Sequence, residues 1–463
     1  MSSWLDFDRF AVFGMGRSGI AAANLLARRG KTVLASDTRP LDEMGEVADQ
    51  LVEGVELVGG LNVVGDSEVV VVSPGLRPTL DIFEDLERRG LPVISEIELG
   101  YAAAKAPILA ITGTDGKSTT TVFVGHLLEH AGVECAVGGN LGTPLCALVD
   151  EVSEDGYIVA EVSAFQLWTT HHFRPRAFGL TNIAHDHLDY FATYDEYVDA
   201  KRQVMAHAGP ETLGVFNRED DYISRWYDEY EGKALAYGLS REAVGEEADA
   251  LWLEEGALWA RFDGEEYPRW HTDVSTIPVT GYHNILNFLC ATGLVHAAGV
   301  DLFDVSVAAD DFEPLPHRLE YVAEVDEVYF YDDSKATNVH AALAGLRSLD
   351  GDLVAIVGGV DKGLDLGDLV DHLRDRGAPV ILIGEIRERL GTELLTAGYP
   401  EADIYAAETL EEAVQRAFEI AMPGWMVSLS PACSSFDMFE SYAHRGEVFQ
   451  RTVRSLSAAS EKN

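Results

Sequence analysis

Short apolar runs alternate with amphipathic helical stretches along most of the chain. This alternation is typical of α/β domains built on mainly parallel sheets. A helix is predicted at residues 283–298, whereas residues 221–280 mix Trp, Tyr and charged residues and predict a β-rich segment without clear strand boundaries. The apolar runs predict strands at residues 10–13, 32–36, 69–72, 108–111, 157–160, 177–180, 354–357, 380–383 and 425–429.

The chain is too long, at 463 residues, to fold around one ordinary hydrophobic core. A new α/β unit starts with the strand that follows Pro107, and the turn residues from Phe312 to Pro316 mark a second boundary. We therefore predict three α/β domains, at residues 1–96, 97–313 and 314–463.

Composition and charge exclude several classes of protein. Asp and Glu total 78 against 34 for Lys and Arg, a formal net charge of −44, so a basic nucleic-acid surface is absent and anionic membranes would repel the chain. The acids are spread along the chain, which predicts a solvated acidic surface suited to a high-salt cytoplasm and a halophilic source.

The sequence shows no sign of export or membrane insertion. The first residues are acidic where a signal peptide would be basic, and no apolar stretch reaches the roughly 18 residues that span a bilayer. Four cysteines lie far apart without CxxC spacing, so neither a disulfide framework nor a zinc site is expected. These features predict a reduced cytoplasmic protein, which we expect to be monomeric.

A glycine-rich turn follows the first predicted strand and opens a helix, with glycines at Gly14, Gly16 and Gly19. Asp37 ends the next strand. Such glycines let the backbone approach a diphosphate at a helix N-terminus, and the acid can accept a hydrogen bond from a ribose hydroxyl. Binding of NAD by an oxidoreductase and a purely structural tight turn both fit this motif when it is taken alone.

A second glycine-rich segment predicts an ATP site. It runs from Gly113 through Thr114, Asp115, Gly116, Lys117 and Ser118 to Thr119, again between a strand and a helix. Backbone N–H groups there can hold phosphate oxygens, Lys117 can reach the terminal phosphates, and the Ser118 hydroxyl can bind Mg²⁺. The usual first glycine of a P-loop is replaced by Ile111, so this is a variant loop.

Two further residues are candidate metal ligands. Glu161 stands at the C-terminal end of the predicted strand 157–160, where nucleotide-binding proteins place a metal-binding carboxylate. His187 lies in the segment Asp186-His187-Leu188-Asp189 and could bind a second metal ion through a neutral ring nitrogen.

Together these residues resemble the muramyl ligases, which use ATP to join a carboxylate to an amino acid. The resemblance rests on the order and spacing of the loop 113–117, Glu161, the segment 186–189 and Lys201, and it extends over nearly the whole chain except residues 221–280. It implies a carbamylated Lys201 that acts as a Mg²⁺ ligand with Ser118, Glu161 and His187. It also implies that Asn284, Asn287, Arg318 and Asp333 contact ATP.

The C-terminal part resembles the branch of the family that adds D-glutamate. It carries Asp-Ser-Lys-Ala-Thr-Asn at 333–338 and Ser-Pro-Ala-Cys at 430–433, whereas the Asp-Asn-Pro-Arg of diaminopimelate-adding relatives is absent. Charge-assisted hydrogen bonds from this part could bind the carboxylates of an acidic amino acid. The resemblance implies an amino-acid site that contains Lys335, Thr337, Lys362, Ser435 and Phe436.

The same resemblance reassigns the first glycine-rich turn from NAD to a UDP-sugar. The implied contacts are Gly14, Gly16, Gly19, Asp37, Thr38, Arg39, Ser73, Gly75 and Asn140. The implied fold has a Rossmann-like N-terminal domain, a central P-loop ATPase-like domain and a Rossmann-like C-terminal domain.

The predicted activity is ATP-dependent addition of D-glutamate to UDP-N-acetylmuramoyl-L-alanine through an acyl phosphate, in peptidoglycan precursor synthesis. Lys117, His187, Lys201 and Arg318 are the predicted catalytic residues, with ATP and Mg²⁺ as cofactors. Three alternatives stay open at this point. They are the same ligase chemistry on another UDP-sugar or carboxylate acceptor in a halophilic archaeon, an NAD-dependent oxidoreductase, and a non-enzymatic nucleotide-binding scaffold.

Overall fold

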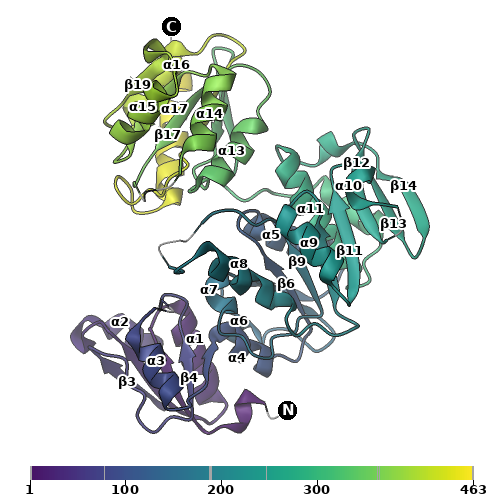
Figure 1. Ribbon diagram of the computed structural model, residues 1–463, viewed down its shortest axis with the longest axis vertical. Coiled ribbons are helices and arrows are strands. Elements are labelled where there is room, and N and C mark those ends of the chain that lie inside the picture. The colour runs from purple at the N-terminus through teal and green to yellow at the C-terminus, as the bar shows by residue number, and fades with distance from the viewer. Residues whose placement is uncertain are drawn as a thin grey trace. The chain divides into compact units, whose positions relative to one another are not determined.

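The computed structural model describes residues 3–77, 79–186, 190–246, 248–361, 363 and 365–460. They form three sheets (Figure 1), and the contacts within the chain divide it into two compact units. The first unit comprises Met1–Ile277 and Ile285–Phe312, and the second comprises Pro278–Asn284 and Glu313–Asn463. Among the described residues, no helix is both long and apolar enough to cross a bilayer.

The N-terminal sheet has the strand order β3-β2-β1-β4-β5, and all of its strand pairs are parallel. Alternate residues of its strands point to opposite faces, so Phe10 and Val12 pack with helices α1 and α4 while Ala11 and Phe13 pack toward α3. Its elements are β1 (Arg9–Phe13), α1 (Arg17–Arg28), β2 (Thr32–Asp37), α2 (Gly45–Gln50), β3 (Val55–Gly59), β4 (Val69–Val72), α3 (Asp81–Arg88), β5 (Val93–Ser95) and α4 (Glu96–Ala103).

The central sheet has the order β14-β13-β12-β11-β10-β9-β6-β8-β7, parallel from β12 to β7 and antiparallel at the end formed by β12, β13 and β14. Its strands are β6 (Ile108–Thr112), β7 (Cys135–Gly139), β8 (Tyr157–Glu161), β9 (Ala177–Leu180), β10 (Leu213–Asn217), β11 (Lys233–Gly238), β12 (Ala250–Glu254), β13 (Ala257–Phe262) and β14 (Glu265–His271). Its helices are α5 (Lys117–His130), α6 (Leu145–Leu148), α7 (Ala164–Leu167), α8 (Tyr194–Arg202), α9 (Asp221–Glu229), α10 (Arg241–Val244), α11 (Tyr282–His296) and α12 (Leu302–Ala309).

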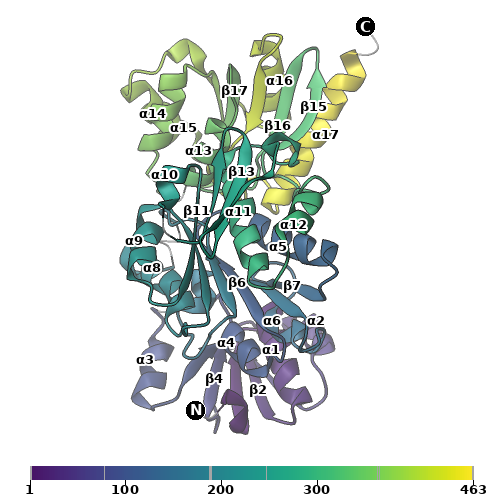
Figure 2. The same ribbon diagram turned by 90° about the vertical axis from the view of Figure 1, so that its right-hand side faces the viewer.

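The third sheet has the order β15-β16-β20-β17-β18-β19 and is parallel apart from the β15–β16 pair. Helices α13, α14 and α15 cover one face, α16 and α17 cover the other, and Figure 2 shows the two groups on opposite sides of β17. Its elements are β15 (Glu320–Val325), β16 (Val328–Asp332), α13 (Val339–Arg347), β17 (Leu353–Gly358), α14 (Gly367–Arg376), β18 (Val380–Ile383), α15 (Arg387–Thr396), β19 (Ile404–Ala406), α16 (Leu410–Ile420), β20 (Met426–Leu429) and α17 (Tyr442–Ser460).

The predicted α/β architecture with mainly parallel sheets is confirmed. The helix predicted at 283–298 is α11, and the β-rich segment 221–280 contains β11 to β14 together with the helices α9 and α10. The proposed boundary at residue 96 falls at the first residue of α4.

Candidate active site

The phosphate loop joins the fully buried strand β6 to helix α5. Gly113 has φ +146° and Gly116 has φ +79°, a region that residues with a Cβ atom rarely adopt. A Cβ at Gly113 would overlap the Thr181 hydroxyl, and one at Gly116 would overlap the side-chain amide of Asn287. The two glycines therefore allow close packing of the loop against its neighbours, among them Asn287, whose contact with ATP stays a prediction.

The segment that follows β9 holds the phosphate loop in place through hydrogen bonds. Asn182 Oδ1 accepts a hydrogen bond from the Asp115 N–H at 2.9 Å, and the Thr181 hydroxyl donates to the Asp115 carbonyl at 2.6 Å. Thr114 Oγ1 lies 3.0 Å from the Tyr197 hydroxyl of α8. The sequence did not single out Thr181 and Tyr197 as parts of the site.

Lys117 is the first residue of α5, where backbone N–H groups are not used inside the helix and favour an anion. Its ammonium nitrogen donates to the Thr114 carbonyl at 2.6 Å, so the side chain folds back over the loop. Ser118 and Thr119 follow in the first turn, and Ser118 is partly exposed. This arrangement fits a site for phosphate oxygens.

Glu161 ends β8 beside the loop that follows β7. The carboxylate is 3% exposed, and its Oε1 accepts from the Asn140 side chain at 2.6 Å. Its Oε2 is buried and has no hydrogen-bond partner in the described structure. A buried carboxylate oxygen without a donor is costly, and a bound cation would remove that cost. The contact of Asn140 with the UDP-sugar stays a prediction, and its side chain binds Glu161 in this structure.

Lys201 lies on α8 and is only 2% exposed. Its Nζ donates to the Gly113 carbonyl at 2.5 Å and sits 4.5 Å from the centre of the Tyr197 ring. Burial lowers the pKa of Lys201 well below the usual value for lysine, and the charge of Lys117 lowers it further. The surroundings therefore favour the neutral amine, which is the form that can react with CO₂. His187 lies outside the described residues.

In the N-terminal sheet, Gly14 and Ser73 directly follow the adjacent strands β1 and β4, at the point where the strand order reverses direction. Parallel α/β sheets bind ligands at such a point. A Cβ at Gly14, which has φ +83°, would come within 2.9 Å of Ser73, so the two loops pack tightly. Gly16 is the N-cap of α1, and a Cβ at Gly19 would overlap the Gly14 carbonyl.

Asp37 contacts protein groups in this structure. Its carboxylate accepts from the Met15 N–H at 2.7 Å and from the Arg39 guanidinium at 2.9 Å, and mainly the Arg39 hydrogen bond lowers its pKa to about 2. The structure thus gives Asp37 a role in holding Arg39 and the glycine-rich turn together, in addition to the ribose contact expected from sequence. Thr38 and Gly75 are exposed at the same edge of the sheet.

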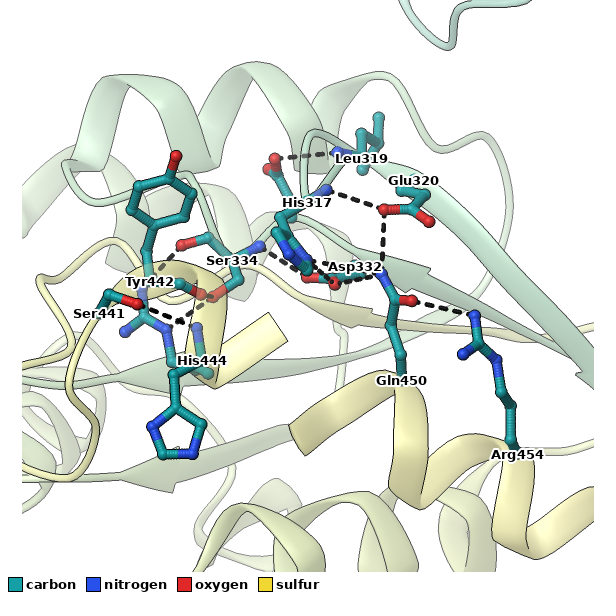
Figure 3. A network of polar contacts seen from close by, with 12 residues as sticks. His317, Leu319, Glu320, Asp332, Ser334, Ser441, Tyr442, His444, Gln450 and Arg454 are labelled. Atoms are coloured by element: carbon teal, nitrogen blue, oxygen red, sulfur yellow. Dashed lines mark hydrogen bonds and ion pairs between the residues drawn. The ribbon is translucent and has the colours of Figure 1, made fainter. Parts of the chain in front are cut away.

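In the second unit, a polar network surrounds the turn that carries Arg318 (Figure 3). The flanking residues His317 and Leu319 have φ of +63° and +49°, which is unusual for residues other than glycine. Hydrogen bonds hold the turn: His317 Nδ1 lies 2.7 Å from Asp332 Oδ2, and the Leu319 N–H donates to Asp333 at 3.1 Å. The predicted contact of Arg318 and Asp333 with ATP stays a prediction, as does that of Asn284.

A glutamine completes this network. The Gln450 side-chain nitrogen donates to Asp332 at 2.9 Å and to Glu320 at 3.0 Å. Hydrogen bonding to Asp332 raises the pKa of His317. The potential metal-ligand atoms of His317, Glu320 and Asp332 lie within 4.8 Å of one another. Because hydrogen-bond donors already occupy the carboxylates, the cluster is better described as a hydrogen-bonded network than as a metal site.

The predicted amino-acid site lies on three adjacent parallel strands. Strands β16, β20 and β17 end in loops that carry Lys335 and Thr337, Ser435 and Phe436, and Lys362 respectively. Parallel strands place their C-terminal ends at one edge of the sheet. Lys335 lies over the Tyr442 ring at 4.3 Å, Ser435 is buried and Phe436 is 74% exposed. Lys362 lies outside the described residues.

Arg445 on α17 ties two of these loops together. Its guanidinium donates to the Ser334 carbonyl at 2.8 Å and to the Cys433 carbonyl at 3.0 Å, while its side chain is almost completely buried. Burial lowers the pKa of Arg445 to about 10. Sequence reasoning missed Arg445 because a basic residue in an amphipathic helix usually faces solvent.

Comparison with known proteins covers all three sheets. Residues 8–95 match the family description Mur ligase MurD-like, N-terminal domain. Residues 111–295 match the Mur ligase middle domain, and residues 317–433 match the description Mur ligase, glutamate ligase domain.

Relatives and solved structures agree with these matches. The UDP-N-acetylmuramoylalanine–D-glutamate ligase of Geotalea daltonii is 36% identical over 97% of this chain and 98% of its own length. That of Acidobacterium capsulatum is 39% identical over 97% and 96%. A pseudomurein peptide ligase type C from Methanothermus fervidus has a TM-score of 0.59 at 17% identity, covering 96% of this chain and 100% of that one, and shares the fold.

These matches exclude the oxidoreductase and the non-enzymatic scaffold that the sequence alone left open. The fold has three α/β domains, and the family is one of ATP-dependent acid–amino-acid ligases. With identity above 30% along nearly its full length, this chain belongs to the Mur ligase family and is a MurD-like member of it.

Proposed function

We propose that this ligase adds D-glutamate to UDP-N-acetylmuramoyl-L-alanine. The observation that carries the proposal is its similarity, along nearly the full length, to ligases named for D-glutamate addition to UDP-N-acetylmuramoylalanine. The MurD-like match of residues 8–95 supports the same acceptor class, because that part of the chain would hold the UDP-sugar.

The reaction would proceed in two balanced steps. The acceptor carboxylate attacks the γ-phosphorus of ATP, which forms an acyl phosphate and releases ADP. The amine of glutamate then attacks the acyl carbon, and the tetrahedral intermediate expels phosphate to leave an amide. Lys117 and the N–H groups at the start of α5 would stabilise the charge on the transferred phosphoryl group.

The residues around the phosphate loop fit bound Mg²⁺. The buried Glu161 Oε2 lacks a hydrogen-bond donor, and the Ser118 hydroxyl is in the first turn of the neighbouring helix. Lys201 would join them as a carbamate, which forms when its neutral amine adds CO₂ and releases a proton. Bound Mg²⁺ would supply charge neutralisation for the phosphates of ATP. His187 is proposed as a further ligand from the family resemblance.

The acidic amino acid would bind at the loops that follow β16, β17 and β20. Thr337, Lys362 and Ser435 are the proposed contacts for its two carboxylates, with Lys335 and Phe436 beside them. Arg445 supports this proposal because it fixes the spacing of two of these loops through their carbonyl groups. The halophilic source, cytoplasmic location and monomeric state remain predictions.

The decisive experiment measures phosphate release from ATP with a panel of acceptors and amino acids. We expect turnover only when UDP-N-acetylmuramoyl-L-alanine and D-glutamate are both present, with L-glutamate inactive. Preference for a diamino acid or alanine would overturn the amino-acid assignment. Turnover with a different UDP-sugar or carboxylate and no turnover with the muramoyl substrate would favour the alternative acceptor instead.

A further inference from the structure

A pocket of about 470 Å³ opens at the edge of the central sheet away from the phosphate loop. Its lining includes Pro107 and Ile108 at the start of β6 and Arg176 just before β9. The phosphate loop begins after the other end of β6. A five-residue strand is about 15 Å long, so the pocket and the loop are separate sites within the first unit.

The side chains that line this pocket carry a net positive charge, whereas the whole chain carries a net negative charge. Its thirteen lining residues include Lys105, Arg174 and Arg176 but only one acidic residue, Glu211. With 34 basic and 78 acidic residues in 463, a set of that size would hold about one basic and about two acidic side chains. Glu211 accepts a hydrogen bond from Lys233 at 2.7 Å and also attracts the charge of Arg176, so the three lining cations and Lys233 outnumber this one carboxylate.

The three cations lack ion-pair partners. In the parts of the chain that the structure describes, no carboxylate oxygen lies within 4.0 Å of a side-chain nitrogen of Lys105, Arg174 or Arg176. Many other arginines of the same unit are paired, including Arg29 with Asp150 at 2.6 Å. The three side chains are exposed, and in a chain so rich in acids their grouping without a carboxylate in contact points to an external anion.

The walls of the pocket have a restricted backbone. Pro107, Pro175 and Pro210 line it, and proline fixes φ near −65°. The turn beside Pro210 is closed by two hydrogen bonds between Gly209 and Thr212, at 2.9 and 3.2 Å. The Arg174 guanidinium lies against this turn, 3.8 Å from the position of a Cβ on Gly209. A rigid wall reduces the entropy lost when a ligand binds.

We propose that this pocket binds a small anion with two or more negative charges, carried by phosphoryl or carboxylate groups. Two guanidinium groups can each offer paired N–H donors to such oxygens, and Lys105 adds a third charge. The proposed ligase reaction does not use this pocket, so its occupancy and the ligase activity can be tested separately.

The test titrates pyrophosphate and citrate by calorimetry into the Lys117→Ala enzyme, in which anion binding at the phosphate loop is weakened. The comparison is with Arg174→Ser/Arg176→Ser in the same background. A matched control, Arg88→Ser/Arg89→Ser, removes the last residue of α3 and the residue after it, two arginines that pair with Asp85. All variants are checked for folding by circular dichroism at the same chloride concentration.

We expect one binding event in the Lys117→Ala background, weakened at least tenfold by the pocket substitutions and less than twofold by the control. Preference for pyrophosphate would identify a phosphorylated ligand, and preference for citrate a polycarboxylate. Absence of binding at about 10 mM ligand, roughly tenfold above a millimolar Kd, or equal losses in the two double variants, would overturn the proposal. Binding that neither pair of substitutions changes would overturn it as well.

Discussion

Lys201 in the first unit and His317 in the second are both buried basic side chains, yet their pKa values are shifted in opposite directions. Lys201 donates to a neutral carbonyl, that of Gly113, and has the ammonium of Lys117 nearby. His317 bonds directly to the carboxylate of Asp332. Burial alone therefore does not determine the charge of a group, because the partner in contact decides whether desolvation or attraction dominates.

This difference corresponds to two kinds of chemistry. A neutral lysine amine is a nucleophile that can be modified, which suits the proposed carbamate beside Glu161. An imidazole bonded to a carboxylate is a fixed structural link, and here it holds the turn that carries Arg318. Substitutions at each site should separate a chemical role from a structural one.

The largest expected effect is at Lys201. Lys201→Ala should lower kcat at least ~10³-fold, because loss of one preorganised electrostatic group costs up to about that factor and a metal ligand would be lost with it. Added small carboxylates should partly restore turnover, since they can replace the carbamate. The measurement is steady-state phosphate release with and without such acids.

Lys201→Glu and Lys201→Gln form the matched pair for this experiment. Glutamate can supply a carboxylate to the metal, so it should keep more activity than glutamine, which has nearly the same size without the charge. Equal activity in the two variants, or a free amine at Lys201 in crystals of the active Mg²⁺-bound enzyme, would contradict the carbamate.

Lys117→Ala should lower kcat/KM by at least ~10²-fold, since Lys117 would stabilise the charge of the transferred phosphoryl group. The pKa of Lys201 should rise in this variant, because the ammonium of Lys117 is one of the causes that lower it. The melting temperature should stay close to that of the wild type. Near-normal ligation by this variant would contradict the assignment of the phosphate loop.

The sequence predicted the buried strands better than the exposed ones, for physical reasons. Buried strands such as β4, β9 and β18 are continuous apolar runs, and their predicted limits match the structure. Lys117 and Glu161 stand where a glycine-rich turn or a strand end already marks a site. The mostly exposed strand β14 has no such apolar run, and its limits were not predicted.

Residues whose role comes from tertiary contacts left no local pattern. Arg445 and Gln450 are more than 100 positions away in sequence from their partners Ser334 and Asp332. In the sequence, each has the spacing of a solvent-facing helix residue. Their burial follows only from the packing of α17 on the sheet. Asp37 was recognised as a polar strand end, but its bond to Arg39 depends on a side-chain conformation that spacing does not specify.

The His317–Asp332 pair predicts a pH-dependent stability in the second unit. Because the folded pKa of His317 is raised above its unfolded value near 6.5, the stabilisation is complete below about pH 6.5 and is lost as the pH rises through the folded pKa. Asp332→Asn should cost about 2 kcal/mol at pH 6 and less at higher pH. Hydrogen exchange of β16 and α17, corrected for intrinsic rates, measures this. If the difference between the variant and the wild type grows with pH, the sign of the shift is wrong.

The smallest expected effect on stability is that of Gln450→Ala. This variant tests how much Gln450 contributes to holding the His317–Asp332 pair. The Gln450 amide donates to both Asp332 and Glu320, so its removal leaves two carboxylates without a shared donor. Asp332 keeps its bonds to His317 and to the Ser334 N–H, and the loss should be only about 1 kcal/mol, or roughly fivefold faster exchange of β16 amides.

The pKa of His317 should rise in this variant, because Asp332 then has fewer donors and attracts the imidazolium more strongly. Gln415→Ala is the matched control, since Gln415 donates to Glu419 on the exposed side of α16 and should change neither quantity. NMR titration of the His317 ring gives the pKa. A fall in that pKa would mean that Gln450 stabilises the imidazolium form. The opposite pKa shifts of His317 and Lys201 would then depend on the whole polar network rather than on Asp332 alone.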